Sequence, residues 1–125
     1  MKNIYLACAY YHEDKEVRVQ RFKKINQVAA LVMAEGYRVF SPISHGHYIS
    51  EFLTDCGNNF WLNQDLDFVF NWAGEVWVFT DEKNAWKKSE GVRVELDVAK
   101  NRGIPVRFIS LDLDGETITF KTWKE

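Results

Sequence analysis

The sequence predicts an α/β protein with a single domain, built on a doubly wound sheet of about five strands that run mostly parallel. Short apolar segments of strand length alternate with longer segments of helical periodicity, a pattern typical of βαβ units. The chain has 125 residues, of which 46% are hydrophobic, so one domain can bury a sizeable core. The pair Asp114-Gly115 predicts a hairpin and therefore an antiparallel edge strand at the C-terminal end.

The first half of the chain predicts two strands and one long helix. Residues 2–9 form a short apolar run bounded by a polar loop, which indicates a buried strand. Residues 15–35 have helical periodicity. The apolar side of this helix carries Phe22, Ile25, Ala29, Val32 and Met33. Residues 37–40 predict a second strand, and residues 43–59 are expected to form a long loop or a broken segment.

The second half continues the alternation of helices and strands. Residues 60–73 and 89–102 predict helices, and residues 75–80, 105–110 and 117–123 predict strands. This order of elements is that of one flavodoxin-like or Rossmann-like domain spanning the whole sequence. Sheets of this kind bind ligands beyond the carboxyl ends of their strands.

Composition and charge exclude several classes of function. Lys and Arg number 16 and Asp and Glu number 18, with no long block of one sign, so duplex nucleic acid is not an expected partner. No run approaches the roughly 18 apolar residues of a membrane span, and the first residues lack the apolar region of a signal peptide. A cytoplasmic location is therefore expected. Cys8 and Cys56 are too few for a disulfide scaffold and are expected to be reduced thiols.

Two carboxylates fall on the apolar sides of the predicted helices. At roughly 100° per residue, Glu95 lies in the middle of an apolar arc, and Asp65 lies among aromatic residues, whereas Asp67 points to solvent. Apolar neighbours disfavour the charged form of a carboxylate, so Asp65 and Glu95 are candidate acid/base or nucleophilic groups. The alternative is a carboxylate that reaches water at a helix end or pairs with an arginine or a backbone amide.

Ser89 and Gly91 open the predicted helix that carries Glu95. Free amides, a hydroxyl and a glycine that lets a ligand approach would suit a phosphate or a sugar hydroxyl. An ordinary serine N-cap explains the same residues, and local sequence alone favours it.

Three motifs carry a resemblance to a known family. They are Ile4-Tyr5-Leu6-Ala7 on the first predicted strand, Gln64-Asp65-Leu66 on the second helix, and Ser89-Glu90-Gly91-Val92-Arg93-Val94-Glu95-Leu96 on the third. From Tyr5 to about Val106, the chain resembles the nucleoside 2-deoxyribosyltransferase-like superfamily. The stretch Val39-Phe40-Ser41-Pro42-Ile43-Ser44-His45 is similar to a small, largely uncharacterised branch of it found in bacteria and their phages.

The resemblance implies cleavage of an N-glycosidic bond through a covalent glycosyl-enzyme. The glutamate that matches Glu95 is the nucleophile that attacks C1′ of the sugar, and the tyrosine that matches Tyr5 orients it. The aspartate that matches Asp65 contacts the sugar or protonates the departing base, although the spacing leaves Asp67 as a competitor. Ser89 matches a serine of the enzymes that hydrolyse nucleoside 5′-monophosphates, where members that take free nucleosides have an aspartate.

The expected protein is therefore an N-glycosidase or deoxyribosyltransferase that acts on a (deoxy)nucleoside 5′-monophosphate or a nucleoside, without a cofactor. The predicted substrate-binding residues are Ala7, Tyr10, Ser44, His45, Ser89 and Gly91. Members of the superfamily commonly complete each active site with a neighbouring subunit, so a homodimer or larger homo-oligomer is expected. The alternative is a non-catalytic module that senses or sequesters a nucleotide-derived ligand.

Other loop residues leave two interpretations open. Tyr10 and Tyr11 either stack on a nucleobase or fill the core, and Arg18 and Arg21 either contact phosphate or stay solvated. No metal is expected, because the candidate ligands lack the spacing of known metal motifs. These ligands are His12, His45, His47 and Cys56.

Overall fold

The computed structural model describes residues 2–53 and 57–121 of the chain. Cys56 and the end of the last predicted strand, residues 122–123, lie outside the described residues. Within the described ranges, no helix combines the length and the apolar character needed to cross a membrane.

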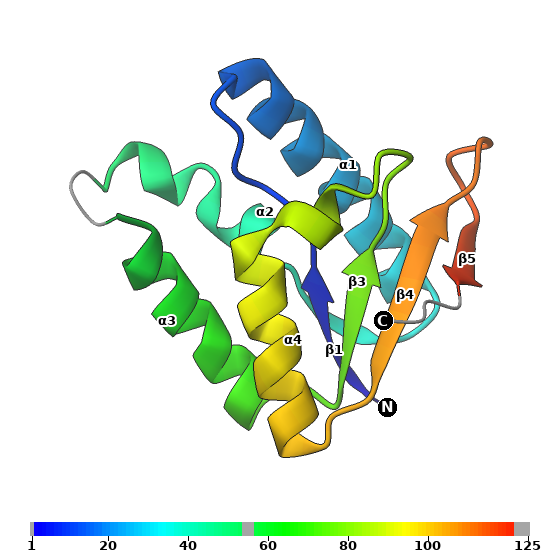
Figure 1. Ribbon diagram of the computed structural model, residues 1–125. Coiled ribbons are helices and arrows are strands. Elements are labelled where there is room, and N and C mark those ends of the chain that lie inside the picture. The colour runs from blue at the N-terminus through cyan, green and yellow to red at the C-terminus, as the bar shows by residue number, and fades with distance from the viewer. Residues whose placement is uncertain (1, 54–56, 122–125) are drawn as a thin grey trace.

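The described residues form a five-stranded sheet in the order β2-β1-β3-β4-β5. The strands are β1 (Asn3–Ala7), β2 (Arg38–Phe40), β3 (Glu75–Phe79), β4 (Val106–Leu111) and β5 (Ile118–Lys121). All neighbours pair in parallel except β4 and β5, which pair antiparallel. The predicted α/β class, with a mostly parallel sheet and an antiparallel C-terminal edge strand, is therefore confirmed (Figure 1).

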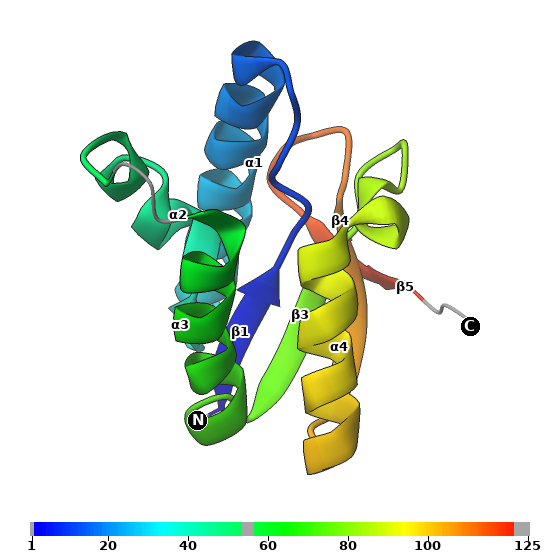
Figure 2. The same cartoon turned by 60° about the vertical axis from the view of Figure 1, so that its left-hand side comes forward.

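Helices cover both faces of this sheet. The long helix α1 lies on one face, and α3 and α4 lie side by side on the other, as the two views in Figures 1 and 2 show. The helical segments are α1 (Lys15–Ala34), α2 (Pro42–Gly46), η1 (Ile49–Glu51), α3 (Gly57–Asn71), η2 (Ala85–Lys88) and α4 (Glu90–Arg102). The predicted helices at 15–35, 60–73 and 89–102 correspond to α1, α3 and α4.

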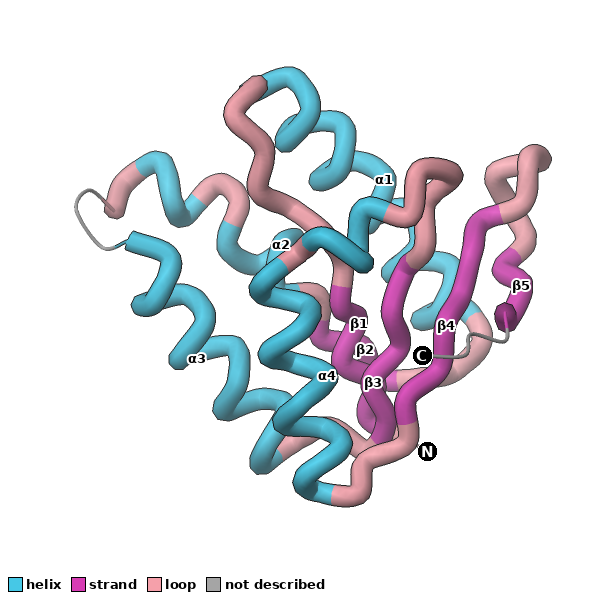
Figure 3. Tube along the Cα trace, viewed as in Figure 1, coloured by secondary structure: helices cyan, strands magenta, loops and turns pink. Residues whose placement is uncertain are grey.

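Of the two alternatives expected for residues 43–59, a long loop or a broken segment, the described residues show a broken segment, with the short helices α2 and η1 before the start of α3 (Figure 3). The α2 helix begins because the Ser41 side chain accepts a hydrogen bond from the backbone N–H of Ser44, and because Pro42 has the backbone angle of a first helical turn. Gly46 then lets the helix pack closely against α3, since a Cβ atom at this position would lie 3.0 Å from a ring carbon of Trp61. This contact joins residues that are distant in sequence, so local patterns do not predict it.

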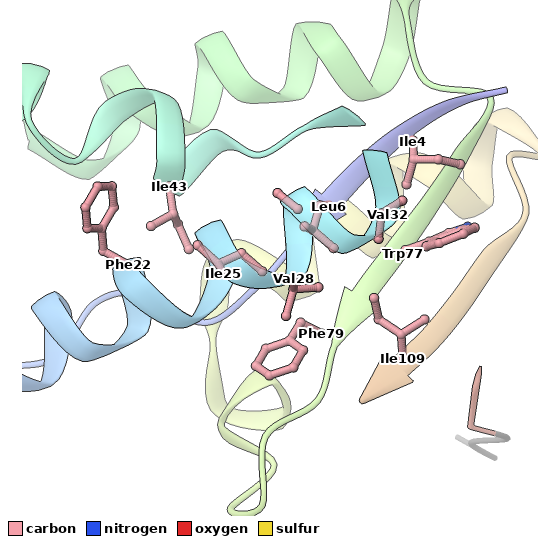
Figure 4. Close-up of a cluster of buried hydrophobic side chains, with 11 residues drawn as sticks. Ile4, Leu6, Phe22, Ile25, Val28, Val32, Ile43, Trp77, Phe79 and Ile109 are labelled. Atoms are coloured by element: carbon pink, nitrogen blue, oxygen red, sulfur yellow. The ribbon is translucent and has the colours of Figure 1, made fainter. Parts of the chain in front are cut away.

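The larger hydrophobic cluster fills the space between α1 and the sheet (Figure 4). From the helix come Phe22, Ile25, Val28, Ala29 and Val32, and from the sheet come Ile4, Leu6, Trp77, Phe79 and Ile109. Met33, predicted on the apolar side, is instead exposed, because it lies at the edge of the apolar stripe near the end of the helix.

A second cluster lies on the opposite face of the sheet, beneath α3 and α4. Its buried members are Tyr5, Ala7, Val69, Val76, Val78, Val92 and Ala99. The α4 helix is bounded as the sequence predicts, since Ser89 caps its N-terminus and Gly103 ends it in the left-handed conformation, with φ of 71°. Alternate residues of β1 therefore face different layers, and Tyr5 faces α4.

Candidate functional site

The centre of the candidate site is a contact between the sheet and α4. The Tyr5 side chain projects from β1 into the layer beneath α3 and α4, and its hydroxyl donates a hydrogen bond to Oε2 of Glu95. Glu95 is buried although its side chain is ionisable, with 6% of its surface exposed. The two residues stand ninety positions apart in the sequence and meet because α4 packs on β3 and β4, on the face of the sheet toward which the Tyr5 side chain projects from neighbouring β1.

Burial controls the protonation of Glu95. Loss of hydration raises the pKa of this carboxyl from 4.5 to about 8, with the hydrogen bond from Tyr5 acting in the opposite direction and the charge of Asp65 adding to the rise. Burial also raises the pKa of the Tyr5 hydroxyl well above 10, and the neighbouring carboxylates raise it further. Tyr5 is therefore a hydrogen-bond donor to Glu95 throughout the ordinary pH range.

Asp65 on α3 supplies a second carboxyl at the same site. Its Oδ1 atom is buried and has no hydrogen-bond partner among residues 2–53 and 57–121. Burial raises the pKa of Asp65 from 3.8 to about 7. A carboxyl with a pKa in this range can hold a proton and release it near neutral pH, which is the property of a general acid or base.

The structure separates Asp65 from its competitor Asp67. Asp67 is exposed and accepts a hydrogen bond of 2.6 Å from the side-chain amide of Asn71, one turn further along α3. Asp65, by contrast, acts electrostatically on both Glu95 and Tyr5. Of the two aspartates that the spacing allowed, Asp65 is the one that lies beside the buried glutamate.

Aromatic rings form a wall next to these carboxyls. Phe40, at the end of β2, stacks on Phe68 of α3 with ring centroids 3.9 Å apart and lies 5.9 Å from the ring of Tyr5. The ring of His45, an exposed residue of α2, lies 5.6 Å from Phe40. Phe68 is not among the site residues predicted from the sequence, although its position three residues after Asp65 on one helix face would have indicated it.

Ser89 and Gly91 lie at the N-terminus of α4, with Ser89 about 9 Å along the helix axis from Glu95. The Ser89 hydroxyl oxygen accepts a hydrogen bond of 3.2 Å from the backbone N–H of Val92, which is the ordinary N-cap that local sequence favoured. Gly91 leaves its surroundings open, since a Cβ atom there would meet only the Ser89 hydroxyl, at 3.8 Å.

Two predicted substrate-binding residues, Ser44 and Tyr10, have hydrogen-bond partners on or next to α1. The Ser44 hydroxyl donates a hydrogen bond to the side-chain oxygen of Asn26 on α1, and the Tyr10 hydroxyl forms one of 2.7 Å with Nδ1 of His47. Tyr10 also packs against the cluster beneath α1. Consecutive helical residues point about 100° apart, which is why Ser44 faces α1 while His45 faces Phe40. Among the described residues, neither Ser44 nor Tyr10 forms a hydrogen bond with Glu95 or Asp65.

The loop between β1 and α1 is held by arginines. Arg21 donates hydrogen bonds to the carbonyl oxygens of Tyr10 and Tyr11, and Arg18 donates to those of His12 and Glu13. These guanidinium groups order the loop, so the structure favours neither phosphate contact nor simple solvation for them. Ala7, by contrast, ends β1 fully buried on the same face of the sheet as Tyr5.

Cysteine and histidine chemistry adds little at this site. Among residues 2–53 and 57–121, no group of three or more histidine, cysteine, aspartate or glutamate side chains is arranged to hold a metal ion. Cys8 is a free cysteine, and burial raises the pKa of its thiol to about 12. The thiol is therefore protonated and unreactive near neutral pH.

Comparisons with known proteins place this fold. Residues 2–111 match a family model described as a domain of unknown function, DUF1937. Among solved structures, the chain is similar to a 2-deoxyribosyltransferase from the psychrotolerant bacterium Bacillus psychrosaccharolyticus, with a TM-score of 0.61 and 21% sequence identity over 86% of this chain and 72% of that chain. No curated protein matches the sequence. The likeness confirms the fold that the resemblance implied.

Proposed function

The chain belongs to the DUF1937 family, and we propose that it is an N-glycosidase or deoxyribosyltransferase acting on a (deoxy)nucleoside 5′-monophosphate or a nucleoside. One observation carries the proposal: the buried Glu95 accepts a hydrogen bond from Tyr5 and lies beside Asp65, whose Oδ1 atom is buried. Two carboxyls with raised pKa values and a shared environment are suited to acid and nucleophile roles at a glycosidic bond. The fold shared with a 2-deoxyribosyltransferase supports the same reaction class.

The proposed reaction has two steps. In the first, the ionised carboxylate of Glu95 forms a bond to C1′ of the sugar while the bond from C1′ to the base nitrogen breaks, and Asp65 delivers its proton to the departing base. In the second, water or an acceptor base attacks C1′, gives up a proton to Asp65 and releases the Glu95 carboxylate. Hydrolysis and transfer therefore share the glycosyl-Glu95 intermediate and differ in the acceptor.

Protonation couples the two carboxyls. Neighbouring carboxyls that repel each other titrate as a pair, and near neutral pH the pair retains one proton. In the unliganded chain this proton lies mainly on Glu95, whose pKa is about 8 against about 7 for Asp65. The first step requires the proton on Asp65, and the hydrogen bond from Tyr5 favours that transfer because it lowers the pKa of Glu95.

Ser89 is the proposed contact for the 5′ end of the substrate. A serine hydroxyl accepts and donates hydrogen bonds at once, so Ser89 can keep the backbone N–H of Val92 while donating its proton to a phosphate oxygen. The N-terminus of α4 favours negative charge at this position, and Gly91 leaves room for it. An aspartate at the same place would repel a phosphate.

The test incubates the protein with each deoxynucleoside monophosphate, ribonucleoside monophosphate and nucleoside, and measures the release of free base by chromatography. We expect wild type and Asp67→Asn to release base, and Glu95→Gln and Asp65→Asn to lose at least a hundredfold in rate. Asp67 is the matched control, because it is an exposed carboxylate on the same helix as Asp65. Tight nucleotide binding without release of base, with or without an acceptor base, would refute the proposed enzymatic activity. It would support the alternative of a non-catalytic binding module.

Substrate class has its own test in Ser89→Asp. Aspartate is also a good N-cap, so the variant is expected to fold normally. We expect the ratio of monophosphate to nucleoside turnover to fall at least tenfold. An unchanged ratio would remove Ser89 from the substrate site and leave it as a helix cap.

We also propose that the chain forms a homo-oligomer. The described residues from α2 to the start of α3 expose several large hydrophobic side chains, and exposed apolar patches mark interaction surfaces. They are Tyr48, Ile49, Phe52, Leu53 and Phe60. Phe52 is the most exposed of these, at 86%, so Phe52→Glu is expected to lower the mass measured by light scattering without unfolding the chain. A monomeric wild type would refute the proposal.

A further inference from the structure

We propose that the chain has a second small-molecule site. It lies at the amino-terminal ends of the parallel strands and binds a ligand that joins a planar ring to an anionic group. A cavity of about 400 Å³ lies there, within the size range of small-ligand pockets. Its lining residues are Lys2, Tyr37, Glu75, Trp77, Arg107 and Phe120.

The charged part of this cavity is built around Glu75. This residue begins β3 and is 2% exposed. Its Oε1 atom accepts hydrogen bonds from Nε1 of Trp77 at 2.8 Å and from Nε of Arg107 at 2.9 Å, and its Oε2 atom accepts one from Lys2. These donors hold the pKa of Glu75 below its usual value, so the carboxylate is ionised. One negative charge then faces two positive charges, and the cluster is net positive.

The two cations retain the capacity to bind an anion. The side chains of Lys2 and Arg107 are 59% and 53% exposed, so both reach the mouth of the cavity. Glu75 uses Nε of Arg107, and no residue in the described part of the chain accepts a hydrogen bond from the Nη atoms of Arg107. A guanidinium held at one edge presents its remaining N–H groups to a carboxylate or phosphate.

Aromatic rings supply the place for a planar group. Trp77 is nearly buried and forms the floor, on the face of the sheet that also packs against α1 (Figure 4). The rings of Tyr37 and Phe120 stand edge-on to Trp77, with centroids 5.1 and 5.0 Å away. Trp77 lies on the central strand β3, Tyr37 precedes the edge strand β2, and Phe120 lies on the other edge strand, β5. The two rings therefore approach Trp77 from opposite edges of the sheet. A ring placed between them would cover Phe120, which is 51% exposed.

This cavity is separate from the candidate catalytic site. Glu95 and Tyr5 lie on the face covered by α3 and α4, whereas Glu75 and Trp77 open onto the face covered by α1. Glu75 and Arg107 also belong to the amino-terminal ends of their strands. A ligand here would not contact the proposed substrate, and the inference does not depend on the proposed reaction.

The test is a titration with phenyl phosphate in which the ¹H–¹⁵N indole resonance of Trp77 is monitored by NMR. This resonance is assigned by its loss in Trp77→Phe, and it reports the cavity directly because the indole N–H is bonded to Glu75. We expect a saturable shift with phenyl phosphate, at least tenfold weaker binding of inorganic phosphate, and no saturation with benzyl alcohol. Absence of a saturable shift with phenyl phosphate would overturn the proposal.

Matched arginine variants make the result specific. Arg107→Gln keeps a donor near Glu75 and is expected to weaken phenyl phosphate binding at least tenfold, as is Phe120→Ala, which leaves the charges in place. Arg107 lies over the ring of Phe120, with Cζ 5.8 Å from the ring centroid. Arg102→Gln is the control, since Arg102 lies over the ring of Phe70 at 4.3 Å in the same way but does not line the cavity. Equal affinity in the two arginine variants would show that the six residues serve only to clamp the strands together.

Discussion

Replacing the buried glutamate with glutamine is expected to make the folded chain more stable at neutral pH. Glutamine has nearly the shape of Glu95 and carries no charge. In the wild type, burial disfavours the ionised carboxylate, and the pKa of Glu95 rises from 4.5 to about 8. The variant removes this cost together with the proposed nucleophile, so stability and activity should change in opposite directions.

The sign follows from proton binding in the two states. Between pH 4.5 and pH 8, Glu95 is ionised in the unfolded chain and keeps its proton in the folded chain. The unfolded state therefore binds fewer protons, and the free energy of unfolding of the wild type falls as pH rises through this window. Below pH 4.5 both states are protonated, and the penalty disappears.

The magnitude at pH 7 follows from the same values. The unfolded carboxyl has by then passed its pKa by roughly 2.5 pH units, and each unit corresponds to about 1.4 kcal/mol. Glu95→Gln should therefore raise the free energy of unfolding by about 3–4 kcal/mol at pH 7. For a chain of this length the gain corresponds to an increase in Tm of about 10 °C.

Thermal unfolding followed by circular dichroism at pH 4 and pH 7 measures this effect. We expect a gain at pH 7 that vanishes at pH 4. Asp97→Asn is the control, since Asp97 lies on the same helix, is exposed and forms a surface ion pair with Arg93 at 3.0 Å, so its loss should change stability by less than about 1 kcal/mol. A Glu95→Gln variant that is equally stabilised at both pH values, or destabilised at pH 7, would refute the reasoning.

Three further outcomes are expected. Tyr5→Phe removes the hydrogen bond that favours ionised Glu95, so the pKa of Glu95 should rise by about one unit or more. Base release at pH 7 should then fall about tenfold and recover at higher pH. An unchanged pH–rate profile would contradict this. Gly46→Ala brings a methyl group within 3.0 Å of the Trp61 ring and should cost about 1–3 kcal/mol in urea unfolding, whereas no loss would mean that α2 moves freely from α3. Ser89→Ala should cost about 1 kcal/mol through the lost N-cap, and Ser89→Asp much less; equal losses would argue against capping.

The order and type of the main elements could be predicted from the sequence, because the signals that specify them are local. Apolar runs and helical periodicity act within a few residues, and so do terminators such as Gly103 and caps such as Ser89. The short helices within residues 43–59 were not predicted, because elements of five and three residues are too short to show a hydrophobic period, although Ser41 and Pro42 mark the start of α2 locally.

The candidate carboxyls were also readable from local pattern. Asp65 and Glu95 fall on apolar helix faces, and a helix face that packs on a sheet is buried wherever the helix lies on it. Local pattern offers no such indication for Ser44 and Tyr10, whose side chains turn toward α1, because their orientation depends on partners from other elements.

Which side chains meet is a property of the tertiary structure alone. The hydrogen bond between Tyr5 and Glu95 joins residues ninety positions apart, and motif resemblance, not local pattern, pointed to it. Nothing local marked Glu75, since its partner Lys2 precedes β1 and its partner Arg107 lies on β4. Parallel pairing places the first residues of β1, β3 and β4 next to one another at the amino-terminal end of the sheet. That alignment exists only once the crossover helices have packed.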